Sequence, residues 1–279
     1  MRLAFSETTP DYENHLAPYQ VLGFPEDGET AATAFGYGML PSNRELTRFY
    51  LARSVRIDLA RYTESRRERY VRRQCDTLRR AFHPRAQLAG PDDWADMCVR
   101  YMNESSWWLT RRGRPFRTAD LTARLNSPMT THLLTLTDTT DNSPAALGTL
   151  YVEPPIAYYA LAFYDPRYRK TGVGSHLMSS VISELQHHGL SHVYLGTCYY
   201  EGARYKTRFT GMEFFDGLGW SDDRKKLQLF LSRQNDLSGQ HLFDHPSYLE
   251  TGPPPRPEDT TLRLADAPQP QHIDSVEEQ

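Results

Sequence analysis

The sequence has few of the features that mark secreted, membrane-spanning or metal-binding proteins. Its 279 residues include three cysteines, Cys75, Cys98 and Cys198, which are far apart and form no Cys-x-x-Cys pair. This number and spacing predict neither a disulfide framework nor a metal site, so we expect a cytoplasmic protein without bound metal. Residues 1–10 turn polar too soon for a signal peptide, and no apolar run is long enough to span a bilayer. A membrane partner is therefore not expected.

The chain also lacks a large net charge, but its charges are unevenly distributed. The formal net charge is −3 at pH 7, yet residues 61–85 contain nine arginines and only three acids. Ser65 followed by Glu68 has the spacing of a capping box and predicts that a helix begins there. Arginine binds phosphate through two parallel hydrogen bonds, so one interpretation is a polyanion-binding helix. The other is a solvated helix face whose arginines pair with acids of the same chain.

Composition and hydrophobic spacing divide the chain into four segments. These are an N-terminal region over 1–60, an Arg-rich and Trp-rich helical segment over 61–130, a domain of alternating strands and helices over 131–237, and a Pro-rich, acidic, mostly disordered tail over 238–279. The elements expected outside the centre are a helix at 44–52, strands at 55–59 and 131–137, helices at 91–110 and 118–126, and a last strand at 227–231. The apolar stripe of the 91–110 helix, from Trp94 to Met102, is expected to be core.

The centre of the chain reads as strand, turn, strand, glycine loop, helix and strand. The strands are expected at 148–153, 156–164 and 193–195, and the helix at 175–188. Between the second strand and the helix lies Arg169-x-x-Gly172-x-Gly174. Backbone amides at a helix N-terminus favour a phosphate or carboxylate, so this loop is a candidate anion site.

The glycine loop resembles the pyrophosphate loop of the Gcn5-related N-acetyltransferases, written Arg/Gln-x-x-Gly-x-Gly/Ala. The resemblance implies an α/β (α+β) fold, a mixed sheet flanked by helices, here with a smaller N-terminal region. It does not by itself imply that coenzyme A is the donor, because fold and function are separate claims.

The stretch after the central helix resembles a narrower group. His192 to Gly196, then Tyr205-Lys206-Thr207-Arg208-Phe209 and Glu213, are similar to the "VYLGY… Y-K-x-x-F-x-P-x-E" signature of the arginyl-tRNA–protein transferases and the aspartate/glutamate leucyltransferases. The resemblance covers about residues 35 to 232. Two departures stand out: the family's Cys-Pro-x-Cys pair is absent from residues 40–43, and Gly211 replaces the proline of the signature.

This resemblance implies that Arg or Leu is moved from a charged tRNA to the N-terminal α-amine of an acceptor protein or peptide. The acceptor would begin with Asp or Glu, as in an N-degron pathway. Aminoacyl-tRNA is then a co-substrate and no cofactor is expected. The residues expected to contact the tRNA backbone are Arg66, Arg67, Arg69, Arg72 and Arg73.

Aminoacyl transfer needs a positioned amine, a stabilised oxyanion and a proton for the departing ribose oxygen. The catalytic candidates are Asp165, Tyr194, Tyr199 and Tyr205, although each tyrosine also suits core packing. The substrate-binding candidates are Arg169, Gly172, Gly174, Lys206, Arg208 and Glu213. Glu213 suits recognition of a basic aminoacyl side chain and equally an ion pair with a surface arginine.

Three other functions are kept open. The fuller glycine loop also suits an acyl-coenzyme A-dependent N-acetyltransferase, in which coenzyme A is the donor. A divergent aminoacyl-tRNA-dependent enzyme acting on a small molecule is a second alternative. A non-catalytic RNA-binding protein that kept the scaffold is the third.

Overall fold

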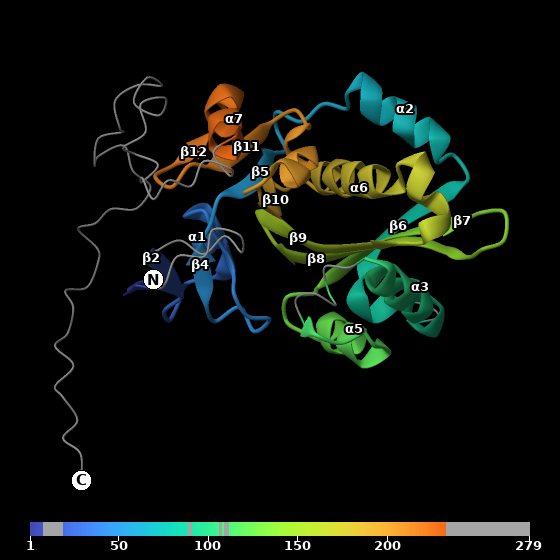
Figure 1. Ribbon diagram of the computed structural model, residues 1–279, viewed down its shortest axis with the longest axis horizontal. Coiled ribbons are helices and arrows are strands. Elements are labelled where there is room, and N and C mark those ends of the chain that lie inside the picture. Colours follow the sequence, from blue (N-terminus) through green and yellow to red (C-terminus); the bar gives the residue numbers. More distant parts are fainter. Residues whose placement is uncertain (8–18, 89–90, 106–107, 109–111, 233–279) are drawn as a thin grey trace, which may run out of the picture.

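The computed structural model describes residues 1–7, 19–88, 91–105, 108 and 112–232 (Figure 1). The expected tail over 238–279 lies outside these residues. Cys75, Cys98 and Cys198 are all buried and free. Among the described residues, no helix is long and apolar enough to cross a membrane, and no group of three or more His, Cys, Asp or Glu side chains is arranged to hold a metal ion.

Within the described residues, the larger of two sheets has eight strands in the order β12–β11–β5–β10–β9–β8–β7–β6. The strands are β5 Ser54–Asp58, β6 Leu78–Pro84, β7 His132–Asp138, β8 Pro144–Glu153, β9 Ile156–Tyr164, β10 His192–Thr197, β11 Met212–Phe215 and β12 Trp220–Ser221. Neighbouring strands are antiparallel except β9 and β10, which are parallel. A mixed sheet flanked by helices confirms the expected fold class.

Helices cover both faces of this sheet because its strands alternate their apolar side chains between two cores. On β7, Leu133 packs toward α3 (Pro91–Glu104) and α5 (Thr118–Leu125), whereas Leu134 packs toward α6 (Val173–His187). In Figure 1, α6 lies along one side of β8 and β9 and α3 along the other. The helix α2 (Arg66–Gln74) packs against α6. The expected apolar stripe of α3 is buried at Trp94, Met97, Cys98 and Met102.

A smaller four-stranded sheet packs beside the larger one. Its strands are β1 Arg2–Glu7, β2 Tyr19–Phe24, β3 Met39–Pro41 and β4 Phe49–Leu51, in the order β1–β2–β4–β3, with α1 Ala31–Gly36 alongside. Phe35 and Phe49 share a core with Ile156 and Tyr194 of the larger sheet. Because β5 and β6 belong to the larger sheet, strands from the three expected segments 1–60, 61–130 and 131–237 form one sheet.

Two of the secondary-structure predictions are wrong. Residues 44–52 contain β4, which pairs with β2 and β3, and not the expected helix. Residues 227–231 lie in the helix α7 (Arg224–Ser232) and not in a strand. Leu227, Phe230 and Leu231 are buried, which is helical spacing, and the Asp223 carboxylate accepts the amide hydrogens of Lys225 and Lys226 as a helix N-cap.

Gly211 occupies the position of the proline in the transferase signature, and its backbone conformation explains why proline is absent here. Its φ is +71°, whereas proline is fixed near −65°. A Cβ on Gly211 would lie 2.4 Å from the backbone oxygen of Asp58. We predict that Gly211→Ala lowers the free energy of unfolding by about 1–3 kcal/mol, measured by urea denaturation.

The matched control is Gly36→Ala, because a Cβ there meets no atom within 4 Å. That change is expected to alter stability by no more than about 0.5 kcal/mol. Equal effects of the two substitutions would contradict the assignment of strain to Gly211.

Candidate active site

The two parallel strands at the centre of the sheet separate along their length. β9 and β10 pair at three positions, ending with Tyr194 opposite Tyr158, whereas β9 continues to Tyr164. Beyond this point both strands are irregular. Ala160 has no partner on β8, and the register between β10 and β5 shifts next to Gly196, whose φ is +85°. Such bulges bend strands and end pairing, so the sheet opens here.

A cavity of about 410 Å³ lies in this opening. Its walls are the second half of β9, the first turns of α6, the end of β10 and the 3₁₀ segment η3 (Glu201–Thr207). The polar side chains that line it are Tyr101, Tyr159, Tyr164, Ser175, Tyr205, Lys206 and Arg208. Of the expected site residues, Gly174, Tyr205, Lys206 and Arg208 are brought together here.

Tyr159 is one of four polar residues at this cavity, with Tyr101, Tyr164 and Ser175, that were not expected from the sequence as site residues. The side chain is 5% exposed, and its hydroxyl makes no hydrogen bond within the described part of the chain. Burial raises its pKa well above the usual value, so the hydroxyl stays protonated. Its ring packs against Gly148, where a Cβ would lie 2.8 Å from it. The only sequence signal was a tyrosine within an apolar strand.

Lys206 places a partly buried amine at the same cavity. Its Nζ donates to the Thr197 backbone oxygen at 2.9 Å, and burial lowers its pKa. Lys206 and Arg208 are the charged groups among the described residues that line the cavity, and none of those residues is acidic. The cavity therefore favours a substrate with negative charge and offers groups that can donate or accept a proton.

The glycine loop forms the beginning of α6, two residues earlier than expected. Gly172 is the N-cap with φ of +81°, and it follows the 3₁₀ segment η2 (Pro166–Thr171). A Cβ on Gly172 would lie 3.2 Å from Val71 of α2, and one on Gly174 would lie 3.3 Å from the Tyr164 ring. Close packing thus accounts for both glycines, although the first amides of α6 still lack acceptors within the helix.

Two charged candidates near this loop are engaged in ion pairs outside the cavity. Arg169 pairs with Glu104 at 3.2 Å. Asp165 is 2% exposed and pairs with Arg100 at 2.9 Å and Arg167 at 3.1 Å. The Asp165 carboxylate also accepts the backbone N–H of Arg167 at 2.8 Å as the N-cap of η2, and Asp165 is not among the residues that line the cavity.

Three further candidates also lie outside the cavity. Glu213 pairs with Arg56 at 2.7 Å, so the ion-pair interpretation describes its position. Tyr194 is buried and receives a 3.4 Å hydrogen bond from Arg56, in the core shared with the smaller sheet. The Tyr199 hydroxyl accepts the backbone N–H of Arg53 at 3.1 Å.

The arginines of α2 divide into two groups. Ser65 and Glu68 form the predicted capping box at the start of the helix. Arg69 and Arg72 bond to Glu64, at its backbone oxygen and its carboxylate. Arg66, Arg67 and Arg73 form the second group. Within the described residues, their side chains make no hydrogen bond or ion pair, so these three arginines are available to an external anion.

Comparison with known proteins identifies a family. The profile described as Acetyltransferase (GNAT) domain matches residues 63–207, just over half of the chain. A search of curated proteins finds no match.

Several solved structures are similar at low scores. L-PGS from Bacillus licheniformis is 14% identical with a TM-score of 0.39, over 53% of this chain and 46% of that chain. FemX is 9% identical with a TM-score of 0.36, over 52% of each chain. A GCN5-related glucosamine N-acetyltransferase region of a fungal multi-domain beta-N-acetylglucosaminidase is 14% identical with a TM-score of 0.39, over 69% of this chain and 23% of that chain. The match spans about half or less of these chains and carries no conclusion about substrate.

The unpartnered hydroxyl of Tyr159 leads to a stability prediction. A buried hydroxyl without a partner costs free energy, so we expect Tyr159→Phe to leave the free energy of unfolding unchanged or to raise it by up to about 1 kcal/mol. The matched control is Tyr168→Phe, because the Tyr168 hydroxyl donates to the Asp138 carboxylate at 2.5 Å. That change should cost about 1.5–3 kcal/mol. A comparable loss in both variants, measured by urea denaturation, would show that Tyr159 has a structural partner.

Proposed function

The chain belongs to the acetyltransferase (GNAT) domain family, and on that basis we propose that it transfers an aminoacyl group from a charged tRNA to the N-terminal α-amine of a protein or peptide. The observation that carries this proposal is the cavity between β9 and β10, which is lined by Lys206 and by Tyr159, whose buried hydroxyl is protonated and has no partner within the described residues. These two groups fit the proton movements that acyl transfer to an amine requires.

In this proposal the acceptor amine attacks the carbonyl carbon of the aminoacyl ester. The new C–N bond forms, the ester C–O bond breaks, and the electron pair of that bond leaves with the ribose oxygen. Tyr159 donates a proton to that oxygen, and Lys206, whose pKa is lowered by burial, accepts the proton lost by the amine. A proton from Lys206 restores the Tyr159 hydroxyl, so each turnover begins from the same state.

The charge of the cavity supports an α-amine as the acceptor. None of the described lining residues is a carboxylate, so an amine that is already neutral near neutral pH suits the cavity best. At pH 7.5 about a third of an N-terminal α-amine is already neutral, against about 0.1% of a lysine side chain. Arg208, which stays positively charged, also suits an acidic first residue, Asp or Glu, as in acceptors of N-degron pathways.

The position of α2 supports a polyanionic donor. Val71 of α2 packs against Gly172, so the arginine helix lies beside the start of α6, and α6 forms one wall of the cavity. Arg66, Arg67 and Arg73 are available there for RNA phosphates. A ribose oxygen needs a proton to leave, whereas a thiolate leaves more easily, so Tyr159 favours an ester over a thioester donor.

Acyl-coenzyme A is a second candidate donor. Gly174 and Ser175 line the cavity at the first turn of α6, where backbone amides suit a pyrophosphate. Under this alternative, coenzyme A binds the purified protein tightly and charged tRNA does not compete with it.

A transfer assay tests the proposed function directly. The purified chain is incubated with tRNA carrying labelled Arg or Leu and with peptides that begin with Asp or Glu. We expect the label to enter the peptide, and Tyr159→Phe and Lys206→Met to lower kcat by about 10²-fold. Tyr194→Phe is the matched control, because this buried tyrosine of β10 lies outside the cavity, and its rate should stay within about two-fold of wild type.

Two outcomes would overturn this proposal. One is the absence of transfer from both charged tRNAs. The other is a loss of activity in Tyr194→Phe as large as that in Tyr159→Phe, since the cavity would then not be the reaction site. Peptides whose α-amine is acetylated but which contain lysine should receive no label.

The role of α2 in RNA binding generates a separate prediction. Because Arg66 and Arg67 are exposed and unpaired, the double variant Arg66→Glu/Arg67→Glu should bind tRNA at least about ten-fold more weakly at low salt. The slope of log affinity against log salt concentration should fall by about 1.5 to 2. Arg117→Glu/Lys225→Glu makes the same charge change elsewhere on the surface and should leave binding within about three-fold of wild type. If both variants lost the same amount of tRNA affinity, the loss would come from the change in net charge alone, and the proposed contact between α2 and tRNA would be contradicted.

A further inference from the structure

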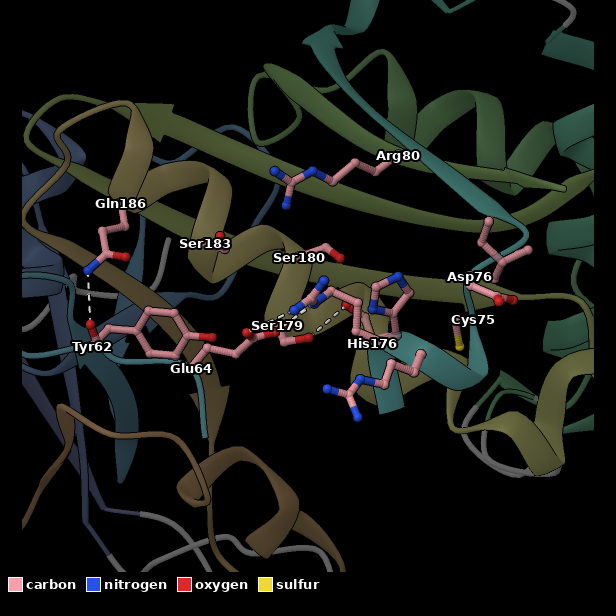
Figure 2. A pocket seen from close by; sticks show the side chains of 13 residues that line it. Tyr62, Glu64, Cys75, Asp76, Arg80, His176, Ser179, Ser180, Ser183 and Gln186 are labelled. Atoms are coloured by element: carbon pink, nitrogen blue, oxygen red, sulfur yellow. Dashed lines mark hydrogen bonds and ion pairs between the residues drawn. The ribbon is translucent and has the colours of Figure 1, made fainter. Parts of the chain in front are cut away.

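A second and larger cavity lies between α2 and α6 (Figure 2). Its volume is about 590 Å³, and it uses residues of α6 that do not line the first cavity. Figure 2 shows Ser179, Ser180 and Ser183 along α6, with Arg80 to one side and Glu64 to the other. The Ser179 hydroxyl donates to the backbone oxygen of His176 at 3.0 Å, so Ser180, Ser183 and the arginines supply the hydrogen-bond donors around this space.

Positive charge exceeds negative charge on this wall. The described residues that line the cavity include three arginines, Arg72, Arg73 and Arg80, and two acids, Glu64 and Asp76. Arg72 pairs with Glu64 at 2.9 Å, and Arg80 makes a longer 3.4 Å ion pair with Glu184 of α6, outside the wall. The Arg73 side chain has no partner within the described residues. An anion in the cavity can therefore reach two arginines that are free or loosely paired.

His176 is an independent observation that points to a ligand in this cavity. Its side chain is 6% exposed, its ring lines the cavity, and its Nδ1 makes no hydrogen bond within the described residues. A buried ring nitrogen without a partner costs free energy, which a hydrogen-bonding ligand would recover. Burial and, after it, the charges of Arg80 and Arg72 lower the pKa of His176, which shows that the positive potential reaches the ring.

We propose that the cavity between α2 and α6 binds the phosphate group of a phosphate monoester, held by Arg73, Arg80 and His176. A phosphate dianion has three terminal oxygens and nearly two negative charges, which match several converging donors better than one carboxylate does. The volume exceeds that of a phosphate group, so the cavity also has room for part of the molecule that carries it. The binding of phosphate does not depend on the proposed transfer reaction.

Two sources supply this chemistry. One is a small phosphorylated metabolite, represented here by ribose 5-phosphate. The other is the 5′-terminal phosphate of an RNA, which lies close to the acceptor end of a tRNA. Both sources present the same phosphate monoester to the arginines, so the experiment distinguishes them by using a different probe for each.

Calorimetric titration with inorganic phosphate and with ribose 5-phosphate, at constant ionic strength, tests the proposal. We expect wild type to bind, and Arg73→Gln and Arg80→Gln each to weaken binding at least about ten-fold, because each removes a charge-assisted hydrogen bond. Both arginines are exposed, so these variants should fold normally. Arg79→Gln is the matched control: Arg79 precedes Arg80 on β6, points to the opposite face and does not line the cavity.

The result that would overturn the proposal is the absence of binding of both probes, or equal affinity of Arg80→Gln and Arg79→Gln. A 3′-tailed RNA hairpin with either a 5′-phosphate or a 5′-hydroxyl identifies the source. If the 5′-phosphate tightens binding of wild type and Arg80→Gln abolishes the difference, RNA is the source. If the two hairpins bind equally while ribose 5-phosphate binds and Arg80→Gln weakens it, the source is a small ester.

Discussion

The early end of hydrogen bonding between β9 and β10 is the constraint on which the rest of the site depends. Two parallel strands that stayed paired would leave no space between them, because neighbouring strands lie less than 5 Å apart. Here pairing stops after Tyr158 and Tyr194, and irregularities at Ala160 and next to Gly196 turn the strands apart. The opening is filled by the first turn of α6 and by η3, and the cavity is what remains.

A single helix then serves two cavities, because its side chains radiate in different directions. Gly174, Ser175 and Met178 face the opening between the strands, whereas Ser179 and Ser183 face α2. The helical repeat of 3.6 residues places these two groups on different flanks of α6. The core-facing flank, with Leu177 and Val181, holds the helix on the sheet. Reaction chemistry and anion binding can thus share one rigid element without sharing side chains.

Features that depend on neighbouring residues in the chain could be predicted from the sequence. The capping box of Ser65 and Glu68 and the buried stripe of α3 are both observed, and a helix follows the glycine loop as expected. The secondary structure of short apolar segments could not be predicted in this way, because a run such as 227–231 fits a strand and a helix alike. The Asp223 N-cap, which favours the helix, lies outside that run.

The sequence by itself determined the fold class, the arginine-rich helix and the presence of Lys206 and Arg208 beside the central strand. Only the tertiary structure decided which tyrosine lines the cavity. Tyr159 and Tyr194 both lie in apolar strands, yet one lines the cavity and the other packs against the smaller sheet. The face on which a strand residue lies depends on register and bulges, and these are set by partners far away in the chain. His176 and Arg80 likewise meet only because α2, β6 and α6 pack together.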